Sequence, residues 1–386
     1  MGLFHTAGDE DIKKGRTTDI YFSRARDVLL KKNIRPNVVA EVITSGLPKG
    51  YTWGVLAGIE ELAKLFEGYD VDVHAMPEGS VFHPWEPVVR IEGDYTVFAE
   101  LETPLLGLIC QASGIATKTA RLRKAAGDKL LLSFGIRRMH PAISPMVDRS
   151  AYIGGADGFS GVGAEKLVGK KASGTMPHAL IISVGDQVTA WRYYDEYVEE
   201  DVPRIALVDT YCDEKTEAIM AAEAVKNLYG VRLDTPGSRR GKMATIVEEV
   251  RWELDIRGYD NVKIFVSGGV DEEDIPLLKG VDGFGIGTSI SNARTIDFAM
   301  DIVEKEGRPV AKRGKRGGKK EVFRCRSCLH TVIVHRDKKK PSTCRECGGE
   351  LESMLKPLVK RGKIVARLPS TGEIRNYVLK QLEKVP

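Results

Sequence analysis

Four cysteines in the C-terminal part of the chain give the clearest chemical signal. Cys325 and Cys328 form one CxxC pair, and Cys344 and Cys347 form a second pair after fifteen intervening residues. Thiolates at this spacing suit four-coordinate, tetrahedral zinc. Because four thiolates leave no open position on the metal, we expect a structural Zn²⁺ that stabilises a module too small for a core of its own.

Two glycine-rich segments predict an anion site. The apolar run 262–266 leads into Ser267-Gly268-Gly269, and the next run leads into Gly285-Ile286-Gly287-Thr288. Main-chain N–H groups just after two neighbouring strands can hold a phosphate close to the backbone. In barrel folds that position is commonly at the last two strand ends. The alternative is that these glycines form ordinary tight turns.

Charged residues follow other apolar runs in the same way. Arg137 and Arg138 come after one run, Asp209 after another, and Arg232 and Asp234 belong to a third. Guanidinium groups suit bidentate binding of phosphate or carboxylate. The two aspartates are expected to bind sugar hydroxyls or Mg²⁺, with capping of the following helices as the alternative.

A histidine begins a further predicted helix at residues 179–184. It ends the segment Gly174-Thr175-Met176-Pro177-His178, which follows a basic stretch that includes Lys166. A single histidine in this position is commonly structural. His178 becomes a candidate catalytic group if it acts as a nucleophile that is phosphorylated.

The elements that would position these residues indicate an α/β protein. From residue 129 short apolar runs alternate with helical stretches, which predicts a parallel sheet, and the recurrence of polar residues after the strands favours a (β/α) barrel. About 160 residues are few for eight strand–helix units, so we expect an irregular, incomplete barrel. The region before it mixes helical and strand periodicity, with a helix over 53–66 and a second helix N-capped by Thr103.

These patterns divide the chain into three predicted domains. An N-terminal α/β sandwich covers 1–128, together with a returning hairpin segment at 290–315. The irregular barrel covers 129–289, and a small C-terminal zinc domain with four cysteine ligands covers 316–386. The basic run 312–320 between the last two domains is interpreted as a solvated linker.

The composition is that of a folded soluble protein. Hydrophobic residues make up 42% of the 386 residues, charged residues make up 29%, and the net charge is +4. No apolar run has the length of a membrane helix and no signal peptide is evident, so we expect a cytoplasmic protein without a membrane partner.

Six ordered motifs together resemble the nicotinate phosphoribosyltransferases, within the type II group that also contains quinolinate and nicotinamide phosphoribosyltransferases. The resemblance covers about residues 17–312. Its motifs are Thr18-Asp19-Ile20-Tyr21, Glu102-Thr103-Pro104-Leu105-Leu106, Phe134-Gly135-Ile136-Arg137-Arg138, Gly174-Thr175-Met176-Pro177-His178, Ser267-Gly268-Gly269 and Gly285-Ile286-Gly287-Thr288. The zinc module departs from the family pattern.

The resemblance implies a homodimer or higher homo-oligomer with shared active sites. Tyr21 would come from the partner subunit and, with Phe134, enclose the pyridine ring, while Arg137 would hold its carboxylate or a nearby phosphate. The two glycine segments would bind the 5′-phosphate, and Asp209, Arg232 and Asp234 would face the ribose or its metal. The full set of implied substrate-binding residues is Tyr21, Phe134, Arg137, Arg138, Lys166, Thr175, Arg232, Ser267, Gly268, Gly269, Gly285, Gly287 and Thr288.

The implied reaction joins nicotinate to phosphoribosyl pyrophosphate and gives nicotinate mononucleotide and pyrophosphate for NAD synthesis. Mg²⁺ would accompany the pyrophosphate, and ATP would act as a co-substrate by phosphorylating His178, so that His178, Asp209 and Asp234 form the catalytic set. Quinolinate and nicotinamide remain alternative substrates. A more distant alternative is a nucleic-acid-binding protein built on an inactive barrel, although the intact set of charged strand ends speaks against nucleic acid as the partner.

Overall fold

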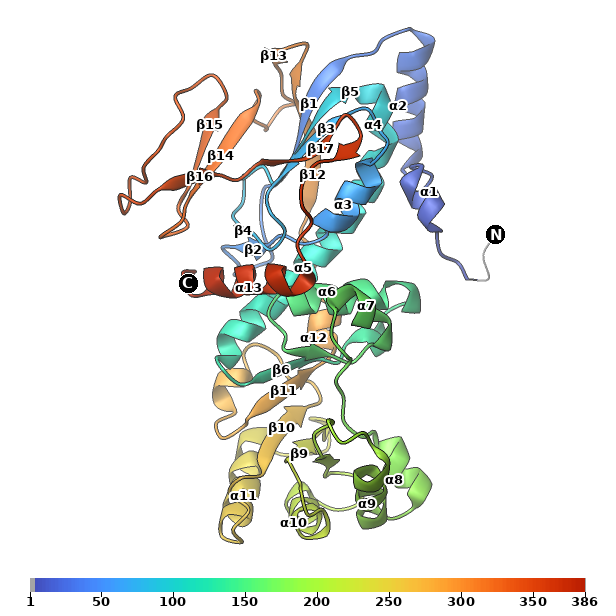
Figure 1. Ribbon diagram of the computed structural model, residues 1–386, viewed down its shortest axis with the longest axis vertical. Coiled ribbons are helices and arrows are strands. Elements are labelled where there is room, and N and C mark those ends of the chain that lie inside the picture. The colour runs from blue at the N-terminus through green and yellow to red at the C-terminus, as the bar shows by residue number, and fades with distance from the viewer. Residues whose placement is uncertain (1–3, 386) are drawn as a thin grey trace. The chain divides into compact units, whose positions relative to one another are not determined.

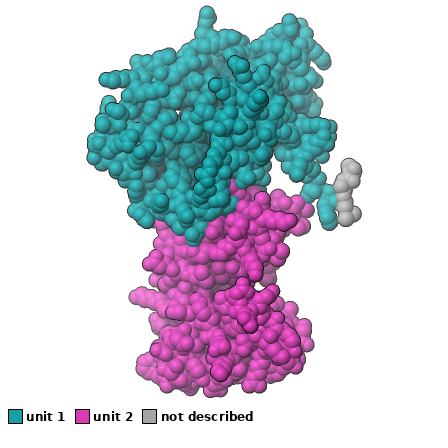
Figure 2. All heavy atoms as spheres, in the orientation of Figure 1, with its two compact units in different colours: residues 1–117, 294–386 teal, residues 118–293 magenta. Residues whose placement is uncertain are grey.

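The computed structural model describes residues 4–385, which form two compact units (Figure 2). The first unit joins the chain up to Thr117 with the chain from Arg294 onward, and the second contains Lys118–Ala293. The two units share α5 (Glu102–Ala126), which begins in the first and ends in the second. No helix in the described part of the chain combines the length and hydropathy needed to cross a membrane.

A seven-stranded sheet forms the centre of the first unit (Figure 1). Its strand order is β13 (Arg308–Pro309), β12 (Phe298–Lys305), β1 (Asn37–Thr44), β5 (Val89–Asp94), β3 (Asp72–Ala75), β17 (Lys356–Lys360) and β18 (Lys363–Ile364). β12 pairs antiparallel with both β1 and β13. The hairpin that follows the half-barrel in the chain therefore pairs with the sheet of the first unit.

The two faces of β1 show why this strand lies at the centre of the sheet. Val38, Ala40 and Val42 alternate along it and belong to the main apolar core, which also contains residues of α3 (Ile59–Phe66) and α5. Glu41 points to the opposite face, beside Arg90 on the paired strand β5. Side chains of a strand alternate between faces, so this one strand contributes both an apolar face and a charged face.

Two local expectations for this unit are wrong. The helix expected over 53–66 begins only at Ile59, because Gly54–Val55 form β2, which pairs with β4 (Val81–Phe82). Thr103 is not the N-cap of α5, since the helix begins at Glu102 directly after a 3-10 turn at Ala99–Leu101. The Thr103 hydroxyl instead donates to Asp19, 2.9 Å away, and joins α5 to the start of α2 (Ile20–Lys31).

The cysteine-bearing segment forms a three-stranded sheet of β14 (Lys320–Cys325), β15 (Thr331–His335) and β16 (Leu351–Ser353). Arg324 of β14 is buried and pairs with buried Glu86, with 2.6 Å between Nη2 and Oε2. After β16 the chain enters β17 and β18 and then α13 (Thr371–Leu382), where Gln381 accepts the Val81 N–H. The limits of a separate zinc domain at 316–386 remain a prediction.

The basic run before β14 is not a freely solvated linker. Lys312 and Lys315 both pair with the nearly buried Asp301, Nζ lying 2.6 and 3.0 Å from its carboxylate oxygens. Lys319 pairs with Glu92 and Lys320 with Glu41. The expectation of a solvated linker is therefore wrong. The acidic partners could not be recognised beside the run, because they lie on β1, β5 and β12.

A six-stranded parallel sheet forms the second unit, in the order β7 (Gly158–Phe159), β6 (Leu130–Ser133), β11 (Gly283–Ile286), β10 (Lys263–Ser267), β9 (Gly230–Leu233) and β8 (Ile205–Leu207) (Figure 1). All five strand pairs are parallel. Intervening helices include α6 (Ser144–Ile153), α8 (His178–Val184), α9 (Gln187–Tyr197), α10 (Glu214–Ala224) and α11 (Met243–Asp255). The sheet is a curled half-barrel, which confirms the expected mixed α/β class and incomplete barrel.

One buried carboxylate holds two strand ends of this sheet together. Asp148 on α6 accepts the Ser133 hydroxyl at the end of β6 and the Gly161 N–H after β7, both at 2.9 Å. A Cβ on Gly161 would lie 2.5 Å from the Asp148 carboxylate, so only glycine fits there. Burial raises the Asp148 pKa to about 6, while the two donors oppose that shift.

This raised pKa predicts a pH-dependent gain of stability for Asp148→Asn. The folded protein binds this proton more tightly than the unfolded chain does, so ionisation of Asp148 destabilises the fold progressively as pH rises from about 4 to 6. Asparagine keeps the shape without titrating, because its amide oxygen can accept the Gly161 N–H while its NH2 group donates to the Ser133 hydroxyl oxygen. At each pH, urea unfolding gives the free energy of unfolding of the variant minus that of wild type. We expect this difference to be roughly 2 kcal/mol more favourable to the variant at pH 7.5 than at pH 4.5.

The matched control is Asp201→Asn, which changes an exposed aspartate of the same unit. It should show little difference between the two pH values. If the gain of Asp148→Asn is the same at pH 4.5 and 7.5, ionisation of the buried carboxyl is not the cause.

Candidate functional site

The sequence-predicted polar residues gather at the carboxyl edge of the half-barrel. Asp209 follows β8, Asp234 follows β9, and Ser267 ends β10 before Gly268. Phe134 follows β6, the strand that pairs with β11. Because the strands are parallel and adjacent in the order β6-β11-β10-β9-β8, these positions lie at one edge of one sheet.

The side chain of Asp209 connects three segments of this edge. Its Oδ1 lies 3.0 Å from Nε2 of His178, at the start of α8. Its Oδ2 accepts the N–H of Asp234 at 3.0 Å and the hydroxyl of Thr235 at 2.9 Å. Neither Asp209 nor Asp234 caps a helix, since the N-caps of α10 and α11 are Asp213 and Lys242. The capping alternative is therefore wrong.

Burial raises the pKa of Asp209, opposed first by the nearby His178 and then by its hydrogen-bond donors. Its side chain is only 3% exposed, whereas that of His178 is 37% exposed. When Asp209 is ionised it accepts the hydrogen on Nε2 of His178. The lone pair on Nδ1 is then available for chemistry.

Arg232 is a connecting residue within the same network. Its guanidinium donates to the Ser267 hydroxyl at 2.9 Å and to the Met176 carbonyl at 3.0 Å, and it lies 3.2 Å from the Asp234 carboxylate. Ser267 also donates to Asp234 at 2.7 Å. Arg232 is buried and two of its nitrogens are engaged in this way. It thus holds the loop before His178 against β9 and β10.

The two glycine segments follow neighbouring strands and leave main-chain donors free. β10 and β11 pair with Ser267 opposite Gly285. Gly268 and Gly269 have φ of +82° and +83°, and a Cβ on Gly268 would lie 2.7 Å from the Asp234 carbonyl. Across residues 4–385, no atom accepts a hydrogen bond from the N–H of Gly268, Gly269, Gly287 or Thr288. Free amides on two adjacent strand ends can receive the oxygens of a phosphate.

Phe134 lies beside this donor group. Its N–H donates to the Ile286 carbonyl at 2.9 Å, and its ring packs so closely on Gly285 that a Cβ there would lie 2.5 Å from a ring carbon. The half-buried ring is placed to support a flat ligand next to the phosphate position.

Other expected site residues are close in sequence but are not joined to this network. Arg137 and Arg138 lie on a 3-10 turn after β6, and both are exposed. Lys166 is exposed on α7 (Glu165–Val168), and Thr175 is half-buried in the loop before His178. No described residue forms an ion pair with Arg137, Arg138 or Lys166. These cations therefore remain available for an anionic ligand.

Tyr21 belongs to the first unit, on α2, where no residue is buried. Its side chain is 58% exposed. Its pKa is raised, by partial desolvation and then by the Asp19 and Glu102 carboxylates. The role of Tyr21 in a partner's site stays a prediction, because it concerns a second chain.

Three residues with clear positioning roles were missed from the sequence. Thr235 binds Asp209, Asp148 holds β6 and β7, and Glu217 on α10 accepts the N–H groups of three successive residues after Asp209, Thr210 to Cys212, at 2.7–3.0 Å. Glu217 is fully buried. The sequence signal for this role is a glutamate near the start of a helix, seven residues after Thr210.

The four predicted zinc ligands come together in the first unit. Sγ of Cys325 lies 3.4 Å from that of Cys347, Sγ of Cys328 lies 3.7 Å from that of Cys344, and all four fall within 4.8 Å of one another. Tetrahedral zinc with bonds of about 2.3 Å separates its sulfur ligands by roughly 3.8 Å. The cluster therefore fits a single metal ion of that size.

Comparison with known proteins agrees with this arrangement. Residues 19–113 match the model for the quinolinate phosphoribosyl transferase N-terminal domain, and residues 115–301 match the model for its C-terminal domain. A crystal structure of nicotinate-nucleotide pyrophosphorylase from Pyrococcus furiosus is 57% identical, with a TM-score of 0.98 over 100% of this chain and 99% of that one.

Two further relatives carry a nicotinate phosphoribosyltransferase name. The Mycobacterium tuberculosis nicotinate phosphoribosyltransferase pncB1 is 29% identical over 90% of this chain and 85% of its own length. The human nicotinic acid phosphoribosyltransferase structure, 22% identical over 96% of this chain and 94% of that one, shares the fold with a TM-score of 0.75. The chain therefore belongs to the nicotinate and quinolinate phosphoribosyltransferase family and is an enzyme of the pentosyltransferase class.

Proposed function

We propose that this enzyme transfers the phosphoribosyl group of phosphoribosyl pyrophosphate to nicotinate, giving nicotinate mononucleotide and pyrophosphate for NAD synthesis. The observation that carries the proposal is the group of free main-chain amides at Gly268, Gly269, Gly287 and Thr288, beside the carboxylate network of Asp209 and Asp234. A phosphate at the amides would bring the attached ribose next to that network. The names of the relatives support the same chemistry.

The pyridine end of the substrate would lie against Phe134. The ring of Phe134 offers an apolar surface, and the unpaired guanidinium groups of Arg137 and Arg138 follow it directly on the same strand-end turn. A guanidinium group suits the planar carboxylate of nicotinate through two parallel hydrogen bonds. We propose that Arg137 binds this carboxylate and that Arg138 and Lys166 contribute positive charge for the pyrophosphate.

The transfer needs little proton movement, because the pyridine nitrogen already has a free lone pair. The bond from ribose C1 to pyrophosphate breaks as the bond from C1 to the ring nitrogen forms, and positive charge develops on the ribose. The carboxylate of Asp234, and that of Asp209 behind it, would stabilise this charge. Both already accept hydrogen bonds from this chain, which favours Mg²⁺ entering together with pyrophosphate, where it would neutralise the leaving group.

The choice of pyridine is tested by incubating the enzyme with phosphoribosyl pyrophosphate and nicotinate, quinolinate or nicotinamide. We expect nicotinate mononucleotide from nicotinate at the highest kcat/KM. Arg137→Gln should raise KM for nicotinate roughly ten- to hundred-fold, the effect of a lost hydrogen bond to a charged group, with a smaller change in KM for phosphoribosyl pyrophosphate. Because the matching family models are named for the quinolinate enzyme, product from quinolinate alone would establish that alternative.

We further propose that ATP drives the reaction by phosphorylating His178. The Asp209 carboxylate holds Nε2, so Nδ1 is the nitrogen that would attack the γ-phosphate of ATP and release ADP. Asp209 would thereby connect the phosphorylated residue with the ribose site, since its other oxygen binds the backbone of Asp234.

We expect His178→Ala to abolish both the rate gain from ATP and the acid-labile phosphate label from γ-labelled ATP. Asp209→Asn should slow phosphorylation by roughly 10²–10⁴, as for the loss of a positioned acid–base partner. The exposed His5 provides the control variant, His5→Ala, which should keep both properties. An unchanged gain from ATP in His178→Ala would exclude the phosphohistidine.

We also propose that Cys325, Cys328, Cys344 and Cys347 hold a structural Zn²⁺. Metal analysis of the purified protein should give one zinc per chain, and a Cys344→Ser variant should lose it. Cys110, which lies on α5, gives the control substitution, Cys110→Ser, with zinc retained. Zinc in the Cys344→Ser protein at the wild-type ratio would contradict the assignment.

Tyr21 bears on the proposed assembly. A helix without buried residues and an exposed tyrosine on it suit a contact with a second copy, so we propose a homodimer in which Tyr21 completes the partner's pyridine site. Light scattering gives the mass in solution. A monomer with full activity would contradict the shared site.

We also propose a cytoplasmic location, with nicotinate, phosphoribosyl pyrophosphate and ATP as the small-molecule partners of the enzyme. Cell fractionation would test the location.

A further inference from the structure

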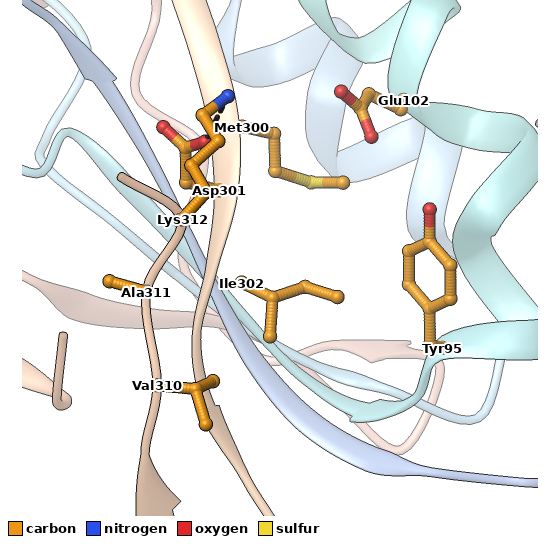
Figure 3. A pocket seen from close by; sticks show the side chains of 8 residues that line it. All are labelled: Tyr95, Glu102, Met300, Asp301, Ile302, Val310, Ala311 and Lys312. Atoms are coloured by element: carbon orange, nitrogen blue, oxygen red, sulfur yellow. Dashed lines mark ion pairs between the residues drawn. The ribbon is translucent and has the colours of Figure 1, made fainter. Parts of the chain in front are cut away.

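The first unit contains a pocket that the phosphoribosyl chemistry does not use (Figure 3). Its volume is about 390 Å³, within the range of small-molecule sites. Its lining comes from α4 (Tyr95–Phe98), the start of α5, β12 and the segment after β13. The lining residues are Tyr95, Glu102, Met300, Asp301, Ile302, Val310, Ala311 and Lys312.

Two polar groups on one wall have no protein partner. Figure 3 shows the Glu102 carboxylate and the Tyr95 hydroxyl on the same side, across open space from Met300 and Ile302. Both residues are half-buried. Within residues 4–385, no group donates a hydrogen bond to the Glu102 carboxylate or forms an ion pair with it, and none bonds the Tyr95 hydroxyl. A half-buried carboxylate left in this way is unfavourable when it is ionised, so it either takes up a proton or pairs with a cationic ligand.

The charges around Glu102 favour a cation. Asp301 on β12 and Asp19 at the start of α2 both make the surroundings of Glu102 more negative, and Tyr21 of α2 and Tyr95 are neutral. Lys312 opposes the acids, but its ammonium group is engaged with Asp301 at 2.6 Å, where Lys315 also binds. The first unit therefore has one carboxylate here that its own lysines do not neutralise.

The apolar wall determines which kind of cation fits. Met300, Ile302 and Val310 supply carbon and sulfur atoms, whereas Ca²⁺ or Mg²⁺ needs six or more oxygen ligands. We propose that the pocket binds a small organic cation, whose ammonium group pairs with Glu102 and hydrogen-bonds to Tyr95 while its apolar part lies against Met300 and Ile302.

The proposal predicts that the affinity for a cation depends on pH. Burial, and then the Asp301 carboxylate, raise the pKa of Glu102 to about 7, so the carboxylate is largely protonated at pH 6 and largely ionised at pH 8. A cation binds the ionised form. Its affinity should therefore rise about ten-fold between pH 6 and 8, while a neutral ligand of the same shape should show no such rise.

Cyclohexylamine is a suitable probe, because it remains protonated in this range and is not a pyridine analogue, and cyclohexanol is its neutral match. Binding to the full-length protein would be measured by calorimetry and ligand-observed NMR, with nicotinate mononucleotide present to occupy the barrel site. We expect cyclohexylamine to bind with the ten-fold pH dependence and cyclohexanol to bind more weakly and without it.

Glu102→Gln should weaken amine binding at pH 8 by at least about ten-fold and remove the pH dependence. Glu67→Gln, at an exposed glutamate of the same unit, should bind like wild type. Should Glu102→Gln fail to fold, Tyr95→Phe is the second variant, and it should weaken the amine several-fold with the pH dependence retained.

Results of two kinds would overturn the proposal, one from binding and one from the mass in solution. One is amine binding to Glu102→Gln that equals wild type, or no binding to wild type at millimolar concentration. The other is a Glu102→Gln protein whose mass by light scattering falls from that of wild type, since Glu102 would then pair with a group of a second copy. Changed amine binding at wild-type mass and wild-type transferase activity concerns the pocket alone. A fall in mass should also lower transferase activity, because Tyr21 would no longer complete the partner's site.

Discussion

The carboxylate of Asp209 is the interaction on which the catalytic edge depends. One oxygen fixes His178 and the other fixes the backbone of Asp234 and the side chain of Thr235. Three consecutive segments, those carrying α8, β8 and β9, therefore meet at one side chain. A carboxylate with both oxygens engaged has little freedom to rotate, so the imidazole and the Asp234 carboxylate hold a fixed separation before any ligand arrives.

The same edge relies on residues that act at a distance from the ligand. Glu217 holds the loop after Asp209 by three main-chain N–H groups, and Arg232 joins the loop before His178 to Ser267. Removing Glu217 would leave three main-chain N–H groups without their acceptor, and removing Arg232 would leave the Asp234 carboxylate without its ion-pair partner. The loops that carry the chemistry are thus tied to the rigid strands beneath them.

Much of this edge could be predicted from the sequence because its cause is local. A parallel strand ends where its apolar run ends, so Asp209, Asp234 and Gly268 could be placed at one edge from the runs alone. The role of Asp148 could not be predicted, because its partners are Ser133, at the end of β6, and Gly161, after the different strand β7. The basic run 312–320 was misread for a similar reason, since its acidic partners come from β1, β5 and β12.

The two units differ in which charges they leave unpaired, and this difference bears on function. In the first unit, lysines of the basic run neutralise Glu41, Glu92 and Asp301, and buried Arg324 neutralises Glu86, so the free carboxylate of Glu102 stands out. At the catalytic edge of the second unit, Arg137, Arg138 and Lys166 carry free positive charges, and four free amides belong to the same edge. A surface that leaves cations and N–H donors unpaired is suited to anions, as phosphoribosyl pyrophosphate and nicotinate both are. The unpaired carboxylate of the first unit is suited to the opposite charge, so the two units are expected to select ligands of opposite sign.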